Sequence, residues 1–401
     1  MSTGRDADLA YTVTALRLEI SMKRPYATLC ASLLLLAGTA LAHATDPRLV
    51  IIDQDGSGPG GSNMMSMMAL LQSPAVRVLG IGVVTGNAWR DDEVRHTLRL
   101  LELLGRTDVP VLPGAVFPLI RTQEETRLAT ALVGQVGWLG AWGQQPDSIT
   151  DHPAGLVEAE KPKVPPGPWD TPPLIEGEPH THAQSEDAAH FLVRQVRAHP
   201  HEVTVYAAGP LTDIALALAI DPQFAALTRG IVIMGGSLNP HTDDPEFANS
   251  PRHEFNFWFD PEAAHMVLRA PWPRIDLTTV DISIQAMFTQ EMVDAIARAP
   301  HPAARYIAAW SQERYYLWDE IAACAWLDHR IIAHERELYL DVDINHGPGY
   351  GNTLSWSAAV KPAVTMPLVH AQTDLDVAAF RRQFIELMSA PAPTGMARNV
   401  P

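Results

Sequence analysis

Cysteine is nearly absent, because the 401-residue sequence contains only two. Cys30 lies in an N-terminal apolar segment that we expect to be removed, which leaves Cys324 alone in the remaining chain. An internal disulfide is therefore excluded from the processed protein. Cys324 has alanine on both sides, which favours a small buried residue over a reactive thiol.

Basic residues are also scarce. The sequence has 29 Lys and Arg against 46 Asp and Glu, which gives a formal net charge of −17. This charge would repel the phosphate backbone of nucleic acids and anionic membrane surfaces, so we expect neither as a partner. A neutral small molecule or a cation suits the composition better.

The N-terminal apolar run, around residues 33–36, is too short to span a membrane stably. It follows the basic stretch MKR at 22–24 and precedes the small-residue motif AHA at 42–44. This arrangement predicts a signal peptide over residues 22–44 and a periplasmic or secreted product, with no membrane attachment after cleavage. Residues 1–21 would then be an upstream artefact of start-codon choice.

Strand-like β-branched runs alternate with helix-like segments along most of the chain. This order is typical of βαβ units, in which helices cover both faces of a sheet. We therefore expect an α/β fold with a doubly wound, mostly parallel sheet. The expected strands cover residues 49–53, 76–84, 109–112, 203–207, 230–234 and 274–280, and the expected helices cover 64–71, 91–104, 188–198, 211–219 and 261–269.

We expect one domain, residues 45–389, to contain this sheet. Residues 120–185 interrupt the alternation with proline, glycine and histidine and have no long periodic pattern, which predicts a loop insertion. Within it, residues 131–142 could form one apolar helix. The proline-rich end, residues 390–401, is expected to be a flexible tail.

A glycine-rich stretch at residues 53–63 follows the first expected strand and contains the pattern GxGxxG of a dinucleotide-binding turn. Asp53 and Asp55 would repel a pyrophosphate, and the residue after the last glycine is Ser62, where a phosphate loop needs lysine. Paired carboxylates at the end of a strand instead suggest a hard cation such as Ca²⁺ or Mg²⁺.

These polar residues also have a structural interpretation. Asp53 and Asp55 could form a turn or cap the following helix, and Ser62 and Asn63 are favoured helix caps just before residue 64. Capping and cation binding can coexist, because an amide carbonyl is an acceptable ligand for Ca²⁺.

Seven short motifs occur in one order along the chain: VIIDQD at 50–55, TGN at 85–87, VPV at 109–111, GPLTDIA at 209–215, MGG at 234–236, EFN at 254–256 and DPEAA at 260–264. This order resembles the inosine/uridine-preferring nucleoside hydrolases, over residues from about 48 to about 328. The resemblance implies cleavage of the N-glycosidic bond of a ribonucleoside with a tightly held Ca²⁺.

The resemblance also implies roles for individual residues at the metal. Asp55 is similar to the carboxylate that ligates Ca²⁺ and takes a proton from water. The other implied metal ligands are Asp53, Asn63, Asp319 and the main-chain carbonyl of Ala208.

A further set of residues falls at or near the positions that bind the substrate in the resembled family. Each has a plainer interpretation: the asparagines could cap or turn, Glu254 could be a solvated charge, and Met234 could pack in the core. Trp318 could stack on the leaving base or simply be a packed aromatic. The set is Ser62, Asn87, Met234, Asn249, Glu254, Asn256 and Trp318.

The sequence departs from the family at the residues of two functions, the binding of the metal and ribose and the protonation of the leaving base. Ser62 and Asn63 stand where the family has paired aspartates, which predicts weaker Ca²⁺ binding and less stabilisation of an oxocarbenium-like transition state. Trp318 replaces the family's histidine acid. Three histidines in loop-like sequence are the remaining candidate proton donors, although each is better explained as a surface residue: His180, His182 and His346.

We therefore expect an exported N-glycosidase that acts on a nucleoside or a related N-riboside. One alternative is a ribose- or nucleoside-binding protein that has lost catalysis through Ser62 and Asn63. A second is a hydrolase of a different glycosidic substrate, with a pocket reshaped by the insertion at 120–185. Because relatives in the resembled family are often homo-oligomers, we expect one here.

Overall fold

A nine-stranded sheet forms the centre of the protein in this computed structural model, which describes residues 46–134, 138–143, 166–242, 253–311 and 315–393. The described residues belong to one compact unit. The predictions for residues 1–21 and for the signal peptide at 22–44 lie outside the described residues.

Seven of the nine strands are parallel. They are β1 (Arg48–Gln54), β2 (Val76–Val83), β3 (Val111–Pro113), β4 (Val203–Ala207), β5 (Gly230–Met234), β6 (Ile275–Thr278) and β11 (Val369–Leu375). At one edge, β9 (Ile332–Val342) pairs antiparallel with β11, and β10 (Thr353–Trp356) pairs antiparallel with β9. A separate antiparallel pair joins β7 (Met287–Phe288) to β8 (Tyr315–Tyr316).

The strand order is β10-β9-β11-β6-β5-β4-β1-β2-β3. The chain therefore winds outward from β1 in one direction through β2 and β3, and from β4 in the opposite direction through β5 and β6. This reversal confirms the predicted doubly wound α/β fold. It also creates a topological switch point between β1 and β4, where open α/β sheets bind their ligands beyond the carboxyl ends of the strands.

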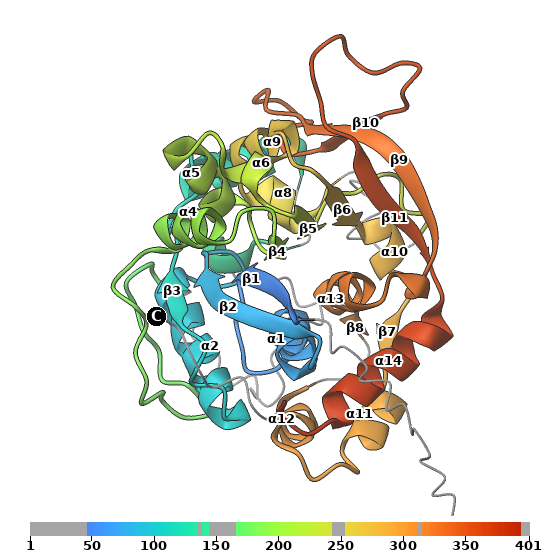
Figure 1. Ribbon diagram of the computed structural model, residues 1–401. Coiled ribbons are helices and arrows are strands. Elements are labelled where there is room, and N and C mark those ends of the chain that lie inside the picture. Colours follow the sequence, from blue (N-terminus) through green and yellow to red (C-terminus); the bar gives the residue numbers. More distant parts are fainter. Residues whose placement is uncertain (1–45, 135–137, 144–165, 243–252, 312–314, 394–401) are drawn as a thin grey trace, which may run out of the picture. The chain divides into compact units, whose positions relative to one another are not determined.

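Helices cover both faces of the sheet (Figure 1). Val50 and Ile52 of β1 pack in one apolar cluster, and Ile51 packs in a second cluster on the opposite face, as the alternation of side chains along a strand requires. The first cluster includes residues of α1 (Gly61–Gln72), α2 (Arg90–Leu104), α11 (Gln290–Ile296), α12 (Pro302–Trp310), α13 (Asp319–Leu327) and α14 (Val377–Ser389). The second includes residues of α4 (Ala188–Ala198), α5 (Thr212–Ile220), α6 (Phe224–Leu227), α8 (Phe255–Phe259) and α9 (Pro261–Arg269).

All six expected strands and five expected helices are present with bounds close to those predicted. The sixth expected helix, at residues 131–142, is wrong. The helix in this region is α3 (Gln123–Val133), which begins where Thr122 Oγ accepts the N–H of Glu125, and is followed by Gly134 at φ +101°. A short 3-10 turn, Gly140–Trp142, comes later.

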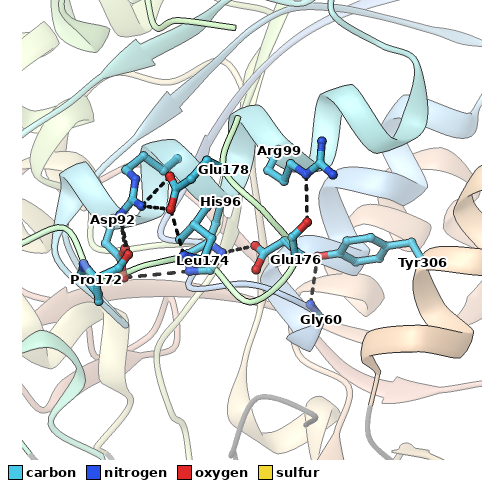
Figure 2. Close-up of polar contacts among 10 residues, drawn as sticks. Gly60, Asp92, His96, Arg99, Pro172, Leu174, Glu176, Glu178 and Tyr306 are labelled. Atoms are coloured by element: carbon cyan, nitrogen blue, oxygen red, sulfur yellow. Dashed lines mark hydrogen bonds and ion pairs between the residues drawn. The ribbon is translucent and has the colours of Figure 1, made fainter. Parts of the chain in front are cut away.

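The second half of the predicted insertion, residues 166–184, runs along α2 without helix or strand. Figure 2 shows Glu176 of this segment hydrogen-bonded to His96 of α2. Arg95 of α2 also pairs with Glu178 at 2.6 Å. This part of the insertion is thus fastened to the helix that follows β2, whereas residues 144–165 lie outside the described residues.

The strands β9, β10 and β11 are not among those expected from sequence. Five of the eleven positions of β9 carry a histidine or a charged residue, so its apolar period is weak. These residues are His334, Glu335, Arg336, Glu337 and Asp341. It is recognisable only from its pairing with β11 and β10. α14 ends at Ser389, next to the predicted tail, and the carbonyl of Ala390 accepts a hydrogen bond from Gln72 at 2.8 Å.

Among the helices that the structure describes, none combines the length and the apolar character needed to cross a membrane.

Candidate functional site

Asp55 lies directly after β1, at the switch point of the sheet. Two glycines allow the neighbouring loops to approach it closely: a Cβ on Gly86 would lie 2.0 Å from Asp55 Oδ2, and a Cβ on Gly209 would lie 3.0 Å from the Asp55 backbone nitrogen. The loops after β2 and β4 therefore meet at this carboxylate. The site predicted from the strand ends is assembled around Asp55.

The Asp55 side chain is fully buried and accepts two hydrogen bonds. Asn63 Nδ2 donates to Oδ1 at 2.7 Å, and the backbone N–H of Asn87 donates to Oδ2 at 3.1 Å. Burial raises the pKa of Asp55 well above its ordinary value, the charge of Asp319 raises it further, and the Asn87 N–H opposes both. A buried carboxyl with a raised pKa is a stronger base once it is ionised.

Asp319 is joined to Asp55 through Gln54. Gln54 Nε2 donates to Asp319 Oδ2 at 3.0 Å, and Gln54 Oε1 accepts the N–H of Asp55 and Nδ2 of Asn63, both at 2.9 Å. Asp319 is buried at the first residue of α13, where the helix dipole favours a negative charge. The predicted convergence of Asp319 and Asp55 is therefore present, with one side-chain amide between them.

Asp53 does not join this group as expected. Its side chain points to the α4 and α5 face of the sheet, where Oδ2 would lie 2.5 Å from a Cβ on Gly82, and it interacts there with the Asp213 carboxyl. Gln54 occupies the opposite face, beside Asp319, because successive side chains of a strand alternate. The expectation that Asp53 shares a cation with Asp319 is thus corrected.

Asp53 and Asp213 form a buried carboxyl pair. Burial and the charge of Asp213 raise the pKa of Asp53 well above its ordinary value, and burial raises the pKa of Asp213 to about 7. Neither oxygen of Asp53 accepts an N–H or hydroxyl bond from the described residues. We infer that the two carboxyls share a proton, since the raised pKa values favour a protonated group in the pair. The backbone N–H of Ala115 donates to Asp213 Oδ1 at 2.7 Å.

Ser62 and Asn63 lie in the first turn of α1, so neither is the cap of that helix. Ser62 Oγ instead donates to Glu320 Oε2 at 2.5 Å and accepts the N–H of Asp319 at 3.1 Å. The hydroxyl that was expected to face the ribose therefore serves the beginning of α13. Asn63 turns its Nδ2 toward Asp55 and its Oδ1 toward Asn87, whose Nδ2 lies at 3.2 Å.

Three of the predicted substrate residues form one cluster at the end of β5. Glu254 caps α8 by accepting the N–H groups of Asn256 and Phe257, and it accepts a third from Gly236. Asn256 Nδ2 donates to the carbonyl of Met234 at 3.1 Å. The plainer interpretation of Glu254 as a solvated charge is wrong, because the side chain is buried as a helix cap, and its charge raises the pKa of Asp55.

Trp318 directly precedes Asp319, is partly buried, and packs edge-to-face on Tyr316 with ring centroids 5.3 Å apart. Two of the three expected histidines make contacts elsewhere: the backbone N–H of His180 donates to Glu102, and His346 Nδ1 is hydrogen-bonded to Glu125. Asn249 lies outside the described residues.

Several polar residues at the site were not anticipated from the sequence. Gln54 is flanked by the two noted aspartates, so its place at a strand end could have singled it out. Asp213 belongs to the recognised GPLTDIA motif. Nothing in the pattern around Trp138 distinguishes it, although its Nε1 donates to Asn87 Oδ1 at 2.6 Å. Glu93 of α2, fully buried, accepts the N–H of Ala88 at 2.7 Å.

The oxygen-bearing groups at and around Asp55 are of the types that ligate an oxygen-preferring divalent cation. Asp55 and Asp319 supply carboxylates and Asn63 supplies an amide, and Ala208, whose carbonyl the resemblance assigns to the metal, follows β4 directly and precedes Gly209. Within the described residues, no three Asp, Glu, His or Cys side chains gather as a cation site.

The chain is similar to known proteins over most of its length. The family model described as "Inosine-uridine preferring nucleoside hydrolase" matches residues 50–382. The "Probable uridine nucleosidase 2" of Arabidopsis thaliana is 31% identical, covering 65% of this chain and 68% of that protein. The "Pyrimidine-specific ribonucleoside hydrolase RihB" of Escherichia coli is 26% identical, covering 82% of this chain and 94% of that protein.

A solved structure shows the same fold. The "Purine-Preferring Ribonucleoside Hydrolase from Gardnerella vaginalis" superimposes with a TM-score of 0.64 at 20% identity, over 87% of this chain and all of the other.

We predict that Asp53→Asn leaves the free energy of unfolding at pH 7 within about 1 kcal/mol of wild type, because the amide N–H replaces the shared proton. Asp53→Ala should cost about 1–3 kcal/mol, because it leaves Asp213 buried without that donor. Urea denaturation measures both. Equal losses in the two variants would show that the pair shares no proton.

The pH dependence provides the control for this prediction. The unfolded chain loses a proton from Asp213 near its ordinary pKa of 3.8, whereas the folded protein keeps it until about pH 7. Wild-type stability should therefore fall as pH rises from about 4 to about 7, and Asp53→Asn should lessen that fall. An unchanged slope contradicts the assignment.

Proposed function

The chain belongs to the inosine-uridine preferring nucleoside hydrolase family, whose members are N-glycosidases, and we propose that it hydrolyses the bond between C1′ and the base nitrogen of a ribonucleoside or related N-riboside. One observation carries this proposal. The buried carboxylate of Asp55 stands at the switch point of the sheet, linked to Asp319 through Gln54.

Asp55 is the base in this proposal. Its raised pKa suits the removal of a proton from a water molecule. The oxygen of that water attacks C1′ as the C1′–N bond breaks and the nucleobase leaves. Two donors, Asn63 Nδ2 and the Asn87 N–H, orient the carboxylate. Because the base must be ionised, turnover should rise as the pH rises through the pKa of Asp55.

The ribose is assigned to the rim formed by Asn87, Glu254 and Asn256. Glu254 and Asp319 are buried acids whose negative charge acts on the position of Asp55. Negative charge at this position stabilises an oxocarbenium-like transition state. Ser62 is left out of this assignment, because its hydroxyl is bonded to Glu320.

We assign Ca²⁺ to Asp55, Asp319, Asn63 and the carbonyl of Ala208, on the basis of their donor types and of the family's general use of calcium. When bound, the cation would make a nearby water a better acid and would hold the ribose diol. Asn63 presents its nitrogen to Asp55, so it would have to turn its amide to offer an oxygen.

Aromatic side chains border the proposed site. Trp138 is bonded to Asn87 and meets Phe255 edge-to-face with ring centroids 6.5 Å apart, and Trp318 precedes Asp319. These rings favour a planar, aromatic leaving group over a second sugar. A nucleoside therefore fits better than the alternative of a different glycosidic substrate.

We predict that Asp55→Ala lowers kcat by at least about 10³-fold, because the attacking water loses its base. Release of reducing sugar from a panel of purine and pyrimidine nucleosides measures the change. Asp294→Ala, which removes an exposed carboxylate on α11, serves as the matched control and should retain full turnover.

Undiminished turnover of Asp55→Ala would refute the assignment of the base. If the wild-type protein is protected by nucleosides against heating and yet releases no base, it is a binding protein. Turnover of other glycosides but of no nucleoside would identify a hydrolase with a different substrate.

Removal of Ca²⁺ provides a separate prediction. Treatment with a chelator should lower nucleoside turnover at least about tenfold, and added Ca²⁺ should restore it. The reason is that the bound cation is expected to lower the activation free energy by a few kcal/mol. Mg²⁺ at the same concentration is the control. Full turnover in the presence of the chelator contradicts the assignment of the cation.

We also place the hydrolase outside the cytoplasm, on the basis of the expected signal peptide at residues 22–44. Produced with its own leader in a bacterial host, the exported protein should begin at Thr45. Mass spectrometry of the intact protein measures this, and an N-terminus that still contains residues 22–44 would contradict the placement.

A further inference from the structure

Trp138 lies in the predicted insertion and connects it to the proposed general base, Asp55, by way of Asn87. Its indole Nε1 donates to Asn87 Oδ1 at 2.6 Å. Its segment is anchored by the N–H of Ala141, which donates to the carbonyl of Gly86 at 2.9 Å. Gly140, at φ +55°, permits this approach, since a Cβ there would lie 2.2 Å from the same carbonyl oxygen.

An indole N–H is a donor and cannot accept a hydrogen bond. The group that faces it must therefore be the oxygen of the Asn87 amide, which leaves the Asn87 nitrogen to face the other way. That nitrogen lies 3.2 Å from Asn63 Oδ1. Trp138 thus fixes the direction of the Asn87 amide, which a weak bond from the same nitrogen to the Asp55 main-chain carbonyl at 3.4 Å supports. Through Asn87 it supports the direction of the Asn63 amide.

With its oxygen toward Asn87, Asn63 directs its nitrogen at Asp55 Oδ1, 2.7 Å away, and at Gln54 Oε1, 2.9 Å away. Gln54 in turn directs its own nitrogen at Asp319 Oδ2, 3.0 Å away. The result is one chain of hydrogen bonds with a single polarity. It begins at an indole donor and ends at two carboxylate acceptors.

This polarity has a consequence for a cation. Each carboxylate receives the positive end of an amide dipole, and the Asn63 oxygen is bonded to Asn87. A cation held by Asp55 and Asn63 would require the Asn63 amide to turn. The NH₂ groups of Asn63 and Asn87, both hydrogen-bond donors, would then face each other. Asn87 could not turn to relieve this conflict while Trp138 donates to its oxygen.

We propose that Trp138 is a positioning residue whose indole N–H locks the Asn87 and Asn63 amides in the direction that opposes a cation between Asp55 and Asn63. The proposal rests on the assignment of the cation to these residues under the proposed function. It identifies Trp138 as a residue that lowers the affinity of the site for Ca²⁺ without touching the cation.

The test is a titration of the full-length processed protein with Ca²⁺ by isothermal calorimetry, without nucleoside. Trp138→Phe keeps a ring but removes the donor, so Asn87 can turn. We expect Ca²⁺ to bind about threefold to tenfold more tightly, as the loss of one net opposing hydrogen bond implies. Trp142→Phe is the matched control, since Trp142 lies in the same segment and stacks on Phe259.

A double-mutant cycle makes the test specific to the amide chain. Asn63→Asp offers oxygen in both directions, so it should tighten Ca²⁺ binding at least about tenfold. In a protein that already carries Asn63→Asp, the further change Trp138→Phe should tighten binding no more. A purely structural role for Trp138 would instead change the affinity equally in both backgrounds.

Unchanged or weaker Ca²⁺ binding by Trp138→Phe overturns the proposal. So does undetectable binding by both the wild type and Trp138→Phe up to about 10 mM, the weak end of protein calcium sites being near 10⁻³ M. The titration contains no nucleoside, so it tests only Ca²⁺ binding. A failure of the proposed hydrolysis would appear separately, in the assay of sugar release from nucleosides.

Discussion

The burial of two carboxylates, Asp55 and Asp319, at the carboxyl end of β1 is the constraint on which the rest of the site depends. An ionised carboxylate away from water is costly unless donors or a cation compensate it. The chain supplies side-chain amides from Gln54 and Asn63 and a backbone N–H from Asn87. Both carboxylates can therefore be held in place by groups that belong to the protein.

The parallel sheet brings these groups together. β1 and β4 are neighbours although about 150 residues separate them in sequence, and the loops that follow them meet because close approach is possible at Gly86 and Gly209. The opposite face of β1 buries Asp53 with Asp213. One strand thus serves two acidic sites, and the direction of each side chain decides which site a residue joins.

Strands β1 to β6 and five of the helices could be predicted from the sequence, as could the gathering of polar residues at the strand ends, because β-branched runs, helical periodicity and polar residues after strands are local features. The direction of Asp53 could not, since it depends on where β1 ends. Trp138 could not either, because its contact with Asn87 depends on how residues 138–143 dock. Ser62 was assigned to the ribose, but its partner, Glu320, is 258 residues away.

A crystal structure with a cationic iminosugar analogue of ribose tests the central claim most directly, because such a ligand carries the charge that develops on the sugar during N-glycosidic cleavage. We expect its ring beyond the end of β1, with Asp55 and Asn87 within hydrogen-bonding distance and Glu254 on the same rim. A ligand bound elsewhere on the protein, with no contact to Asp55, would contradict the account.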